Sequence, residues 1–480
     1  MRASKELLPL VVDLDGTLTL TDTLAESVVQ IVKRNPLNLV RLPVWLLGGR
    51  ASFKRAIASR THPLAASLPY RQSLVDYLTA EKSRGRRIVL ATAAHRSVAE
   101  NVATHLELFD DVLATDGSDN LKGSAKLAQI QQRIGRDFVY AGDSSADLPI
   151  WQASQGAVLA GVSSDVAASV RSAVPVEREF ANADAGLAIW IKALRVHQWL
   201  KNLLLFVPLF TAFSFFDTDK LTTLMLAFVA MSLGASGTYI LNDLWDLAND
   251  RQHPRKCTRP FASGALSIAN GLGCSAMLLV SSLALGLIAS PGFAAMLALY
   301  LVMTSAYSWT LKKKPLIDVI VLSLLYTLRI FAGSVAVDIP VSKWLLAFSL
   351  LTFLSLALVK RCAELVSMRQ SGAQPPAGRD YRVADLEVLW PLGIGAALSA
   401  VVVFGLFINS ADTVARYGEA SLLWLVAIGF IYLLGRLWLA TVRGEMDDDP
   451  VVFVMEDRGS RITMLSMVAI VLLAHFTHFP

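Results

Sequence analysis

The chain has 480 residues, of which 54% are hydrophobic and 17% charged, with a formal net charge of +5. This length leaves room for two or three domains, but the composition is too apolar for soluble domains alone. Residues 1–185 mix basic with acidic side chains, whereas the rest is a succession of apolar runs. The three cysteines, Cys257, Cys274 and Cys362, have no Cys-x-x-Cys spacing and indicate neither a disulfide framework nor a zinc site.

Two carboxylates follow the first apolar run of the chain. The segment Leu10-Val11-Val12 predicts a short buried strand of a parallel sheet, and it ends at Asp13-Leu-Asp15-Gly-Thr. The carboxyl edge of such a sheet is where α/β proteins bind their ligands. Asp13 and Asp15 are therefore candidate site residues.

Three later segments also carry polar or charged side chains at positions where a site could form. Residues 86–92 predict a second strand that ends in the hydroxyl of Thr92, and Lys126 lies on a predicted helix. A third strand is predicted over residues 138–142, with Asp143 and Asp147 directly after it. Strands that end at one edge of a sheet bring such side chains together.

The four segments resemble, in this order, the four sequence motifs of the haloacid dehalogenase phosphatases. They carry Asp13 with Asp15, then Thr92, then Lys126, and then Asp143 with Asp147. The resemblance implies an α/β Rossmann-like domain over residues 1–185, with a small helical cap over about residues 20–75, that hydrolyses phosphate monoesters. It implies that Asp13 is the nucleophile and that Asp15 is the general acid and base. It also implies one Mg²⁺ at Asp13, the Asp15 carbonyl, Asp143 and Asp147, with the phosphoryl group bound by Thr92 and Lys126.

Alternatives remain open in this half. The Thr92 hydroxyl could equally cap a helix at the strand end. Lys122 competes with Lys126, which we prefer because Gly123-x-x-Lys126 has the spacing of the family. The apolar segment 37–47 is interpreted first as the core of the cap, and second as a face that rests on the bilayer or on the membrane half of the chain.

Apolar runs of about 20 residues, each long enough to cross a bilayer, dominate the second half. We expect a linker or interfacial helix over residues 186–198, followed by an all-α multi-pass membrane domain over residues 199–480. Nine transmembrane helices are predicted, near residues 199–217, 221–241, 269–289, 292–311, 316–337, 343–360, 388–408, 421–440 and 462–478.

The orientation follows from the connections between these runs. The chain opens without an export signal, so the amino-terminal half is expected in the cytoplasm. Alternate connections are then cytoplasmic and carry most of the Lys and Arg, whereas the outer ones carry only Lys220, Lys343 and Arg416. This asymmetry predicts a protein of the cytoplasmic (inner) membrane with its carboxyl terminus outside.

An acidic motif stands where the second apolar run ends. Helical spacing places Asn242, Asp243, Asp246 and Asp250 on one face, where their oxygens could hold Mg²⁺ that bridges a diphosphate. Acids at this depth are costly unless they have a function. The motif resembles the first aspartate motif of the UbiA superfamily of intramembrane transferases, and so does its extension through His253-Pro254, Arg259-Pro260 and Gly264.

Cations replace the second aspartate motif that prenyl-transferring members of the superfamily carry. Asp380 and Asp385 are five residues apart and do not form it. The pattern resembles the polyprenyl-phosphate phosphoribosyltransferase branch instead. That resemblance implies substrate contacts from Arg195, Lys201, Asn202, Arg259, Tyr307, Lys312, Asp318, Arg329, Lys360, Arg361 and Glu364. For the Lys and Arg residues at helix ends, a role as membrane anchors is the alternative.

The two resemblances together predict a bifunctional membrane enzyme. Phosphoribosyl pyrophosphate would be the donor and a polyprenyl phosphate the acceptor, with one or more Mg²⁺ in the transferase site. The phosphatase would then remove the 5-phosphate to give polyprenyl-phosphoryl ribose. The main rival is a prenyltransferase that moves a prenyl group from a prenyl diphosphate to a small acceptor. A transporter of the P-type ATPase kind is disfavoured because residues 20–75 are too few for a nucleotide-binding insertion, and no nucleic-acid partner is expected.

Overall fold

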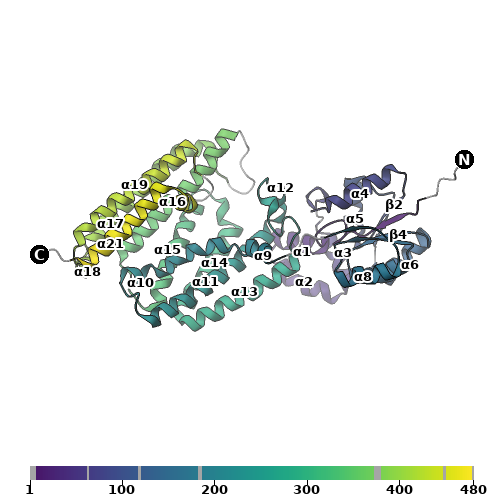
Figure 1. Ribbon diagram of the computed structural model, residues 1–480, viewed down its shortest axis with the longest axis horizontal. Coiled ribbons are helices and arrows are strands. Elements are labelled where there is room, and N and C mark those ends of the chain that lie inside the picture. The colour runs from purple at the N-terminus through teal and green to yellow at the C-terminus, as the bar shows by residue number, and fades with distance from the viewer. Residues whose placement is uncertain are drawn as a thin grey trace. The chain divides into compact units, whose positions relative to one another are not determined.

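The computed structural model describes residues 7–61, 64–116, 121–181, 186–371, 380–446 and 450–477. The chain forms two compact units, Met1–Arg195 with Tyr239–Ala276, and Val196–Thr238 with Met277–Pro480. The first unit thus joins the amino-terminal half to the segment that carries the acidic motif. Figure 1 shows the elements of both units along the chain.

A six-stranded parallel sheet forms the centre of the first unit, in the order β3-β2-β1-β4-β5-β6. This confirms the predicted parallel α/β domain. The order reverses between β1 and β4, which makes the carboxyl ends of these two strands a topological switch point where ligands bind. The strands are β1 Leu10–Val12, β2 Ile88–His95, β3 Asp111–Thr115, β4 Val139–Gly142, β5 Gly156–Ala160 and β6 Val176–Phe180.

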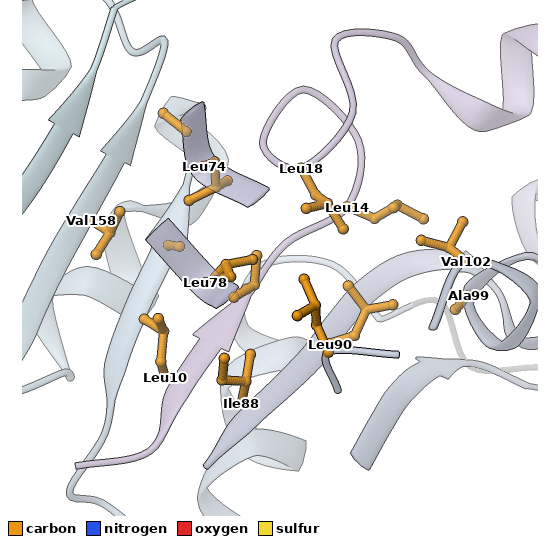
Figure 2. Packing of buried hydrophobic residues seen from close by; sticks show 14 of the residues in the cluster. Leu10, Leu14, Leu18, Leu74, Leu78, Ile88, Leu90, Ala99, Val102 and Val158 are labelled. Atoms are coloured by element: carbon orange, nitrogen blue, oxygen red, sulfur yellow. The ribbon is translucent and has the colours of Figure 1, made fainter. Parts of the chain in front are cut away.

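Helices cover both faces of this sheet because side chains alternate along each strand. Leu10 and Val12 of β1 face one buried cluster and Val11 faces the other. Figure 2 shows the first cluster, in which Leu74 and Leu78 pack over the strands. The helices of this unit are α1 Thr23–Arg34, α2 Asn38–Leu47, α3 Arg50–Ala58, η1 Ala65–Ser67, α4 Gln72–Ser83, α5 Arg96–Leu106, α6 Ser124–Arg133, η2 Ser145–Asp147, α7 Leu148–Gln152, α8 Ser164–Ala173, α9 Leu187–Leu194, α12 Leu247–Gln252 and η4 Lys256–Thr258.

Helix α2 differs from the first interpretation of its sequence. The apolar segment was expected to form the core of the cap, but no α2 residue whose side chain is described is buried. Its large apolar side chains are instead exposed. Apolar composition predicts that a segment is kept from water, but it does not identify the surface that covers the segment.

Long apolar helices dominate the second unit, which shares α11 and α13 with the first. The elements are η3 Val196–Phe206, α10 Val207–Thr211, α11 Thr218–Trp245, α13 Ile268–Ala289, α14 Pro291–Trp309, η5 Leu311–Lys313, α15 Ile317–Val337, α16 Lys343–Ser371, η6 Val383–Asp385, α17 Leu386–Ile408, α18 Ala411–Arg416, η7 Ala420–Leu422, α19 Leu423–Arg443, α20 Pro450–Glu456 and α21 Arg458–Phe476. Over the described residues, eight helices are long and apolar enough to cross a membrane.

The predicted count of nine spans is therefore not confirmed, and the difference lies in residues 199–217. This run forms the 3₁₀-helix η3 and the short helix α10, with Pro208 in the first turn of α10. A 3₁₀-helix rises about 2 Å per residue, so the eleven residues of η3 cover roughly 22 Å. The composition of this run predicts an apolar environment but does not distinguish an α-helical from a 3₁₀ backbone.

Close packing of η3 on α15 depends on a glycine. A Cβ atom built at Gly333 would collide with the Leu205 backbone carbonyl. A backbone carbonyl cannot turn away as a flexible side chain can. The two elements can therefore approach this closely only because residue 333 has no side chain.

We expect Gly333→Ala to lower the thermal unfolding temperature of the purified protein in detergent, because the added methyl group overpacks the contact at a cost of about 1–3 kcal/mol. Gly395→Ala is the matched control. Nothing lies within 4 Å of a Cβ at Gly395 of α17. That substitution should be neutral or slightly stabilising, since Ala is the better helix former by roughly 0.5–1 kcal/mol. Equal unfolding temperatures for the two variants would contradict the packing argument.

Candidate active sites

The predicted nucleophile lies at the carboxyl end of β1. Asp13 is only 9% exposed. Its Oδ1 accepts a hydrogen bond from the Leu14 N–H at 2.8 Å, and its Oδ2 lies 2.9 Å from Lys126 Nζ. Burial raises the pKa of Asp13, and the Lys126 ammonium opposes that rise. The structure therefore brings two predicted site residues into direct contact.

Three carboxylates meet at the tips of β1 and β4. Oxygens of Asp13, Asp143 and Asp147 lie within 4.8 Å of one another, the only group of three His, Cys, Asp or Glu side chains this close among the described residues. Hard divalent cations such as Mg²⁺ prefer an all-oxygen set of this kind. Burial, followed by the charges of Asp13 and Asp147, raises the pKa of Asp143 to about 7. These residues fit the predicted metal site.

A glycine and an arginine shape the loop that directly follows the two predicted catalytic acids. Gly16 has φ of +79°, and a Cβ there would collide with the Asp143 carboxylate. Arg71 donates hydrogen bonds to the Gly16 carbonyl at 3.0 Å and the Thr17 carbonyl at 3.1 Å. Arg71 was missed in the sequence because it lies 55 residues from this loop and follows no motif.

The candidate general acid and base, Asp15, is held by helix α1. Its Oδ1 accepts a hydrogen bond from the Thr23 N–H at 2.8 Å. Burial, followed by the charge of Asp22, raises the pKa of Asp15 to about 7. A carboxyl group with a pKa near the working pH can both give and take a proton.

Lys126 lies within a buried polar network. Its Nζ donates to the Tyr140 hydroxyl at 3.0 Å, and that hydroxyl donates to Asp147 Oδ1 at 2.9 Å. Burial and the nearby aspartates raise the pKa of Tyr140 well above its usual value, so it remains a donor. Thr92 lines the cavity above these residues, and its hydroxyl accepts the Ala94 N–H within β2 at 3.0 Å. The following helix α5 has His95 as its N-cap, so Thr92 does not cap that helix.

A cavity of about 410 Å³ opens over these acids and is lined by both lysines that competed in the sequence, Lys122 and Lys126. The cap adds Lys54 of α3, whose Nζ donates to the Ala93 carbonyl at 2.7 Å. Burial lowers the pKa of Lys54. No motif marks Lys54 in the sequence, because cap residues reach the site only through tertiary packing.

The acidic motif spans the junction of α11 and α12. The helical hydrogen bonds persist across it, from Asp246 N–H to the Asn242 carbonyl at 3.0 Å and from Asp250 N–H to the Asp246 carbonyl at 2.9 Å. The four-residue spacing therefore keeps these residues on adjacent turns of one face, as the sequence predicts.

Arginines hold the acids of this motif. Asp243, 3% exposed, forms ion pairs with Arg195 and, at 3.1 Å, with Arg259. The same Arg259 nitrogen lies 2.6 Å from Asp250 Oδ2. The structure thus joins four of the predicted residues through ion pairs. Their oxygen donors are the type that Mg²⁺ takes.

Helix α1 contacts both sites within the first unit. Its first residue, Thr23, binds Asp15, whereas Lys33 in its last turn donates to the Trp245 carbonyl at 2.8 Å and lies 3.9 Å from Asp246. Ten residues of α-helix rise about 15 Å. Lys33 was missed because the sequence offered no reason to bring it to the acidic motif.

In the second unit, the intramembrane Arg329 is fully engaged by protein groups. It donates to Asn202 Oδ1 at 3.0 Å, to the Tyr300 hydroxyl at 2.9 Å and to the Leu325 carbonyl at 2.8 Å. The centre of the Tyr326 ring lies 5.2 Å from this guanidinium and 5.8 Å from Lys201 Nζ. Asn202, Lys201 and Arg329 therefore form one network.

A second buried cluster surrounds Arg361. This side chain is 1% exposed, pairs with Glu364, and lies 3.0 Å from Asp318 Oδ2. Asp318 also accepts a hydrogen bond from Tyr381, which sequence reasoning did not select. Arg361 Nη2 has no hydrogen-bond partner among the described residues. A buried donor left in this state is costly and favours a ligand that is still to bind.

The remaining predicted contacts lie on the same unit. Lys360 precedes Arg361 on α16, Tyr307 lies on α14, and Lys312 lies on η5 directly after α14. Their sequence pattern stays a prediction of substrate contact.

Together these features define the class of protein. An α/β domain with an acid-lined phosphoryl site joins apolar spanning helices with an acidic motif and buried arginine clusters. Residues 203–456 match the UbiA prenyltransferase family, and residues 10–152 match the haloacid dehalogenase-like hydrolases. The chain belongs to the UbiA prenyltransferase family and carries a haloacid dehalogenase-like hydrolase domain. It is an integral membrane enzyme.

Known relatives fall into two groups by length of match. "Uncharacterized protein y4nM" of Sinorhizobium fredii is 37% identical over 94% of this chain and 88% of its own, so the match includes both domains. Nodulation protein NoeC of Azorhizobium caulinodans is 34% identical over 58% of this chain and 90% of its own. Decaprenyl-phosphate phosphoribosyltransferase of Mycobacterium tuberculosis is 31% identical over 61% of this chain and 94% of its own.

Protons should compete with Mg²⁺ at the phosphoryl site. A carboxylate binds the metal when ionised, so with the pKa of Asp143 at about 7 the affinity is complete above this pH and is lost as pH falls through it. We expect the Mg²⁺ concentration for half-maximal hydrolysis of p-nitrophenyl phosphate to be roughly tenfold higher at about pH 6 than at about pH 8. A value that does not change between these pH values would contradict the electrostatics described for Asp143.

Proposed function

We propose that the membrane domain transfers phosphoribose from phosphoribosyl pyrophosphate to a polyprenyl phosphate. An oxygen of the lipid phosphate attacks the anomeric carbon of the ribose as the bond to pyrophosphate breaks. The phosphatase domain then hydrolyses the 5-phosphate to inorganic phosphate. The final product is polyprenyl-phosphoryl ribose.

The observation that carries this proposal is the presence of a UbiA-type transferase domain and a haloacid dehalogenase-like domain in one chain. Transfer of phosphoribose leaves a phosphate monoester on the lipid product, whereas transfer of a prenyl group to a small acceptor leaves none. A phosphatase site with Asp13, Asp15 and Lys126 in contact geometry then has a substrate. The relative named decaprenyl-phosphate phosphoribosyltransferase supports the same choice.

Buried cations in the transferase domain support the proposal that its substrates are phosphorylated. Bound at Asn242, Asp243, Asp246 and Asp250, Mg²⁺ would neutralise the leaving pyrophosphate. Arg195 and Arg259, which now pair with Asp243, would then be free to bind phosphate oxygens. Arg361 Nη2 is a buried donor that has no hydrogen-bond partner in the described part of the chain. A guanidinium is suited to bind two phosphate oxygens at once.

The proposed hydrolysis can be carried out by the residues described at the phosphatase site. Asp13 attacks the phosphorus of the 5-phosphate while Asp15 gives a proton to the leaving ribose oxygen, and an aspartyl-phosphate forms. Asp15, now ionised, takes a proton from the water that releases phosphate. Lys126 binds the transferring group, and Mg²⁺ bound at Asp13, Asp143 and Asp147 would neutralise its equatorial oxygens.

Covalent linkage favours the sequence of reactions. A tethered second site experiences its substrate at roughly millimolar effective concentration, and the bilayer confines the lipid further. Helix α1, which contacts Asp15 at one end and lies beside Asp246 at the other, spans the distance between the two sites in the first unit. We place both sites on the cytoplasmic face of the membrane, where phosphoribosyl pyrophosphate is available.

The decisive experiment compares Asp13→Asn with Asp243→Asn. We expect Asp13→Asn to accumulate the 5-phosphorylated lipid, because an amide cannot attack phosphorus and the transferase does not use Asp13. Asp243→Asn should lose transfer by a factor on the order of 10² or more, since one anionic metal ligand is lost, and should keep hydrolysis of p-nitrophenyl phosphate. Mass spectrometry of lipid extracts after incubation with Mg²⁺, phosphoribosyl pyrophosphate and polyprenyl phosphate gives the answer.

Two results would overturn the proposal. If wild type and Asp13→Asn gave one identical lipid that carried no ribose, both the coupling and the phosphoribosyl assignment would be wrong. If purified protein consumed a prenyl diphosphate and a small aromatic acceptor instead, the enzyme would be a prenyltransferase with a separate phosphatase.

Arg361 provides a second test of substrate binding. We expect Arg361→Ala to reduce transfer by at least roughly tenfold, and Arg361→Lys to be harmful as well, because an ammonium cannot reproduce the planar pair of donors. The control is Arg369→Ala on the same helix, where the side chain is exposed. Equal and small losses in initial rate across these variants would support the membrane-anchor interpretation.

A further inference from the structure

Helix α2 presents an apolar face that no part of the described structure covers. Val40, Val44 and Leu47 are 75%, 64% and 88% exposed. With Leu39 and Leu46 they cover about half of the helix circumference, at 3.6 residues per turn. On the surface of a soluble domain, a helix normally turns its apolar side chains toward the protein core and its polar side chains toward water.

The opposite face of α2 is the one that packs on the protein. Asn38, Leu42 and Trp45 are half-buried and follow one another at spacings of four and three residues. Asn38 donates to the Ile31 carbonyl at 3.3 Å, and the Arg60 guanidinium lies 4.7 Å from the centre of the Trp45 ring. The helix is thus fixed in an orientation that turns its apolar side chains outward.

A strong positive charge accompanies this face. Residues 33–60 contain seven basic residues and no acidic one. A helix with large apolar side chains among Lys and Arg has the composition of segments that lie in the interface of an anionic bilayer. The basic residues are Lys33, Arg34, Arg41, Arg50, Lys54, Arg55 and Arg60.

We propose that α2 lies in the membrane interface, with Leu39, Val40, Val44 and Leu47 among the acyl chains and the surrounding cations at anionic headgroups. With ten residues, α2 is about 15 Å long and cannot cross the bilayer. The chain is already held at a membrane by its spanning helices, so a bilayer is always present. Lys33 and Lys54 have partners within the protein, but a protein partner at α2 would leave the excess of arginine around this helix unexplained.

This contact would also place the phosphatase cavity near the lipid headgroups. Helix α3 follows α2 after two glycines, and its residues Lys54, Ile57 and Ala58 line the cavity. A phosphate carried on a lipid would then meet the cavity at the depth where its headgroup lies. This second statement rests on the proposed phosphatase function, whereas the membrane contact does not.

Spin labels on the full-length protein in vesicles test the contact. Cys257 and Cys274 are replaced by serine, Cys362 is buried and unreactive, and a nitroxide is attached at Val44→Cys or at the control Gln132→Cys on α6. In vesicles of phosphatidylcholine with phosphatidylglycerol, we expect the ratio of oxygen to nickel-chelate collisions to be at least about threefold higher at position 44 than at position 132.

Each other outcome contradicts the proposal in its own way. Equal access of the nickel chelate to both positions would mean that α2 lies in water. Low collision rates of position 44 with both oxygen and nickel would mean that protein covers it, either a second copy or another chain. A high ratio that is the same in vesicles of phosphatidylcholine alone would remove the role of the cations.

A kinetic arm tests the consequence for catalysis. Val40→Ser/Val44→Ser should raise the KM for a polyprenyl-linked phosphate monoester in vesicles roughly tenfold, with kcat/KM for p-nitrophenyl phosphate unchanged. An unchanged KM for the lipid would overturn the delivery role. If wild type hydrolysed neither substrate, the proposed phosphatase function would fail, and the spin labels would still decide the membrane contact.

Discussion

One buried ion pair holds the first unit together. Both carboxylate oxygens of Glu26 in α1 bind Arg251 of α12, at 2.5 and 3.1 Å, and the side chains are 5% and 7% exposed. Arg251 also donates to the carbonyls of Ala262 and Ser67. Removal of one partner of such a pair costs about 3–5 kcal/mol, because the other charge stays buried. The loop that follows the acidic motif is thereby fixed on the helix that holds Asp15, and the two sites become parts of one compact body.

The same principle recurs at each site, where a buried acid is balanced by a cation. Lys126 balances Asp13, Arg195 and Arg259 balance Asp243, and Arg361 balances Asp318. The proposed reaction of two phosphorylated substrates would need both charges, since acids would hold the metal and cations would hold the phosphates. Before substrate arrives, each neutralises the other. Binding then exchanges an internal ion pair for contacts with metal and phosphate, which limits the cost of burying charge.

Much of the phosphatase domain could be predicted because its motifs are local. A short apolar strand followed by Asp13 and Asp15, and another followed by Asp143, fixes where acids stand in a parallel sheet. Site residues that belong to no sequence motif could not be predicted. Arg71, Lys54 and Lys33 enter their sites from the cap or the helix after it, and only packing brings them there. Tyr381 is of the same kind, since its contact with Asp318 joins residues 63 apart.

By itself, the sequence determined the parallel α/β domain, the UbiA-type membrane domain and the spacing of the acidic motif, because periodicity and strand ends act over a few residues. Tertiary structure decided three further features. Residues 199–217 form a 3₁₀-helix, which packs closely on Gly333, and a short α-helix, and apolar composition cannot report backbone type. Helix α2 turns Val40, Val44 and Leu47 outward because its other face, with Asn38, Leu42 and Trp45, packs on the protein. The acidic motif joins the phosphatase unit because the Glu26–Arg251 pair spans 225 residues of sequence, a distance over which no local pattern carries information.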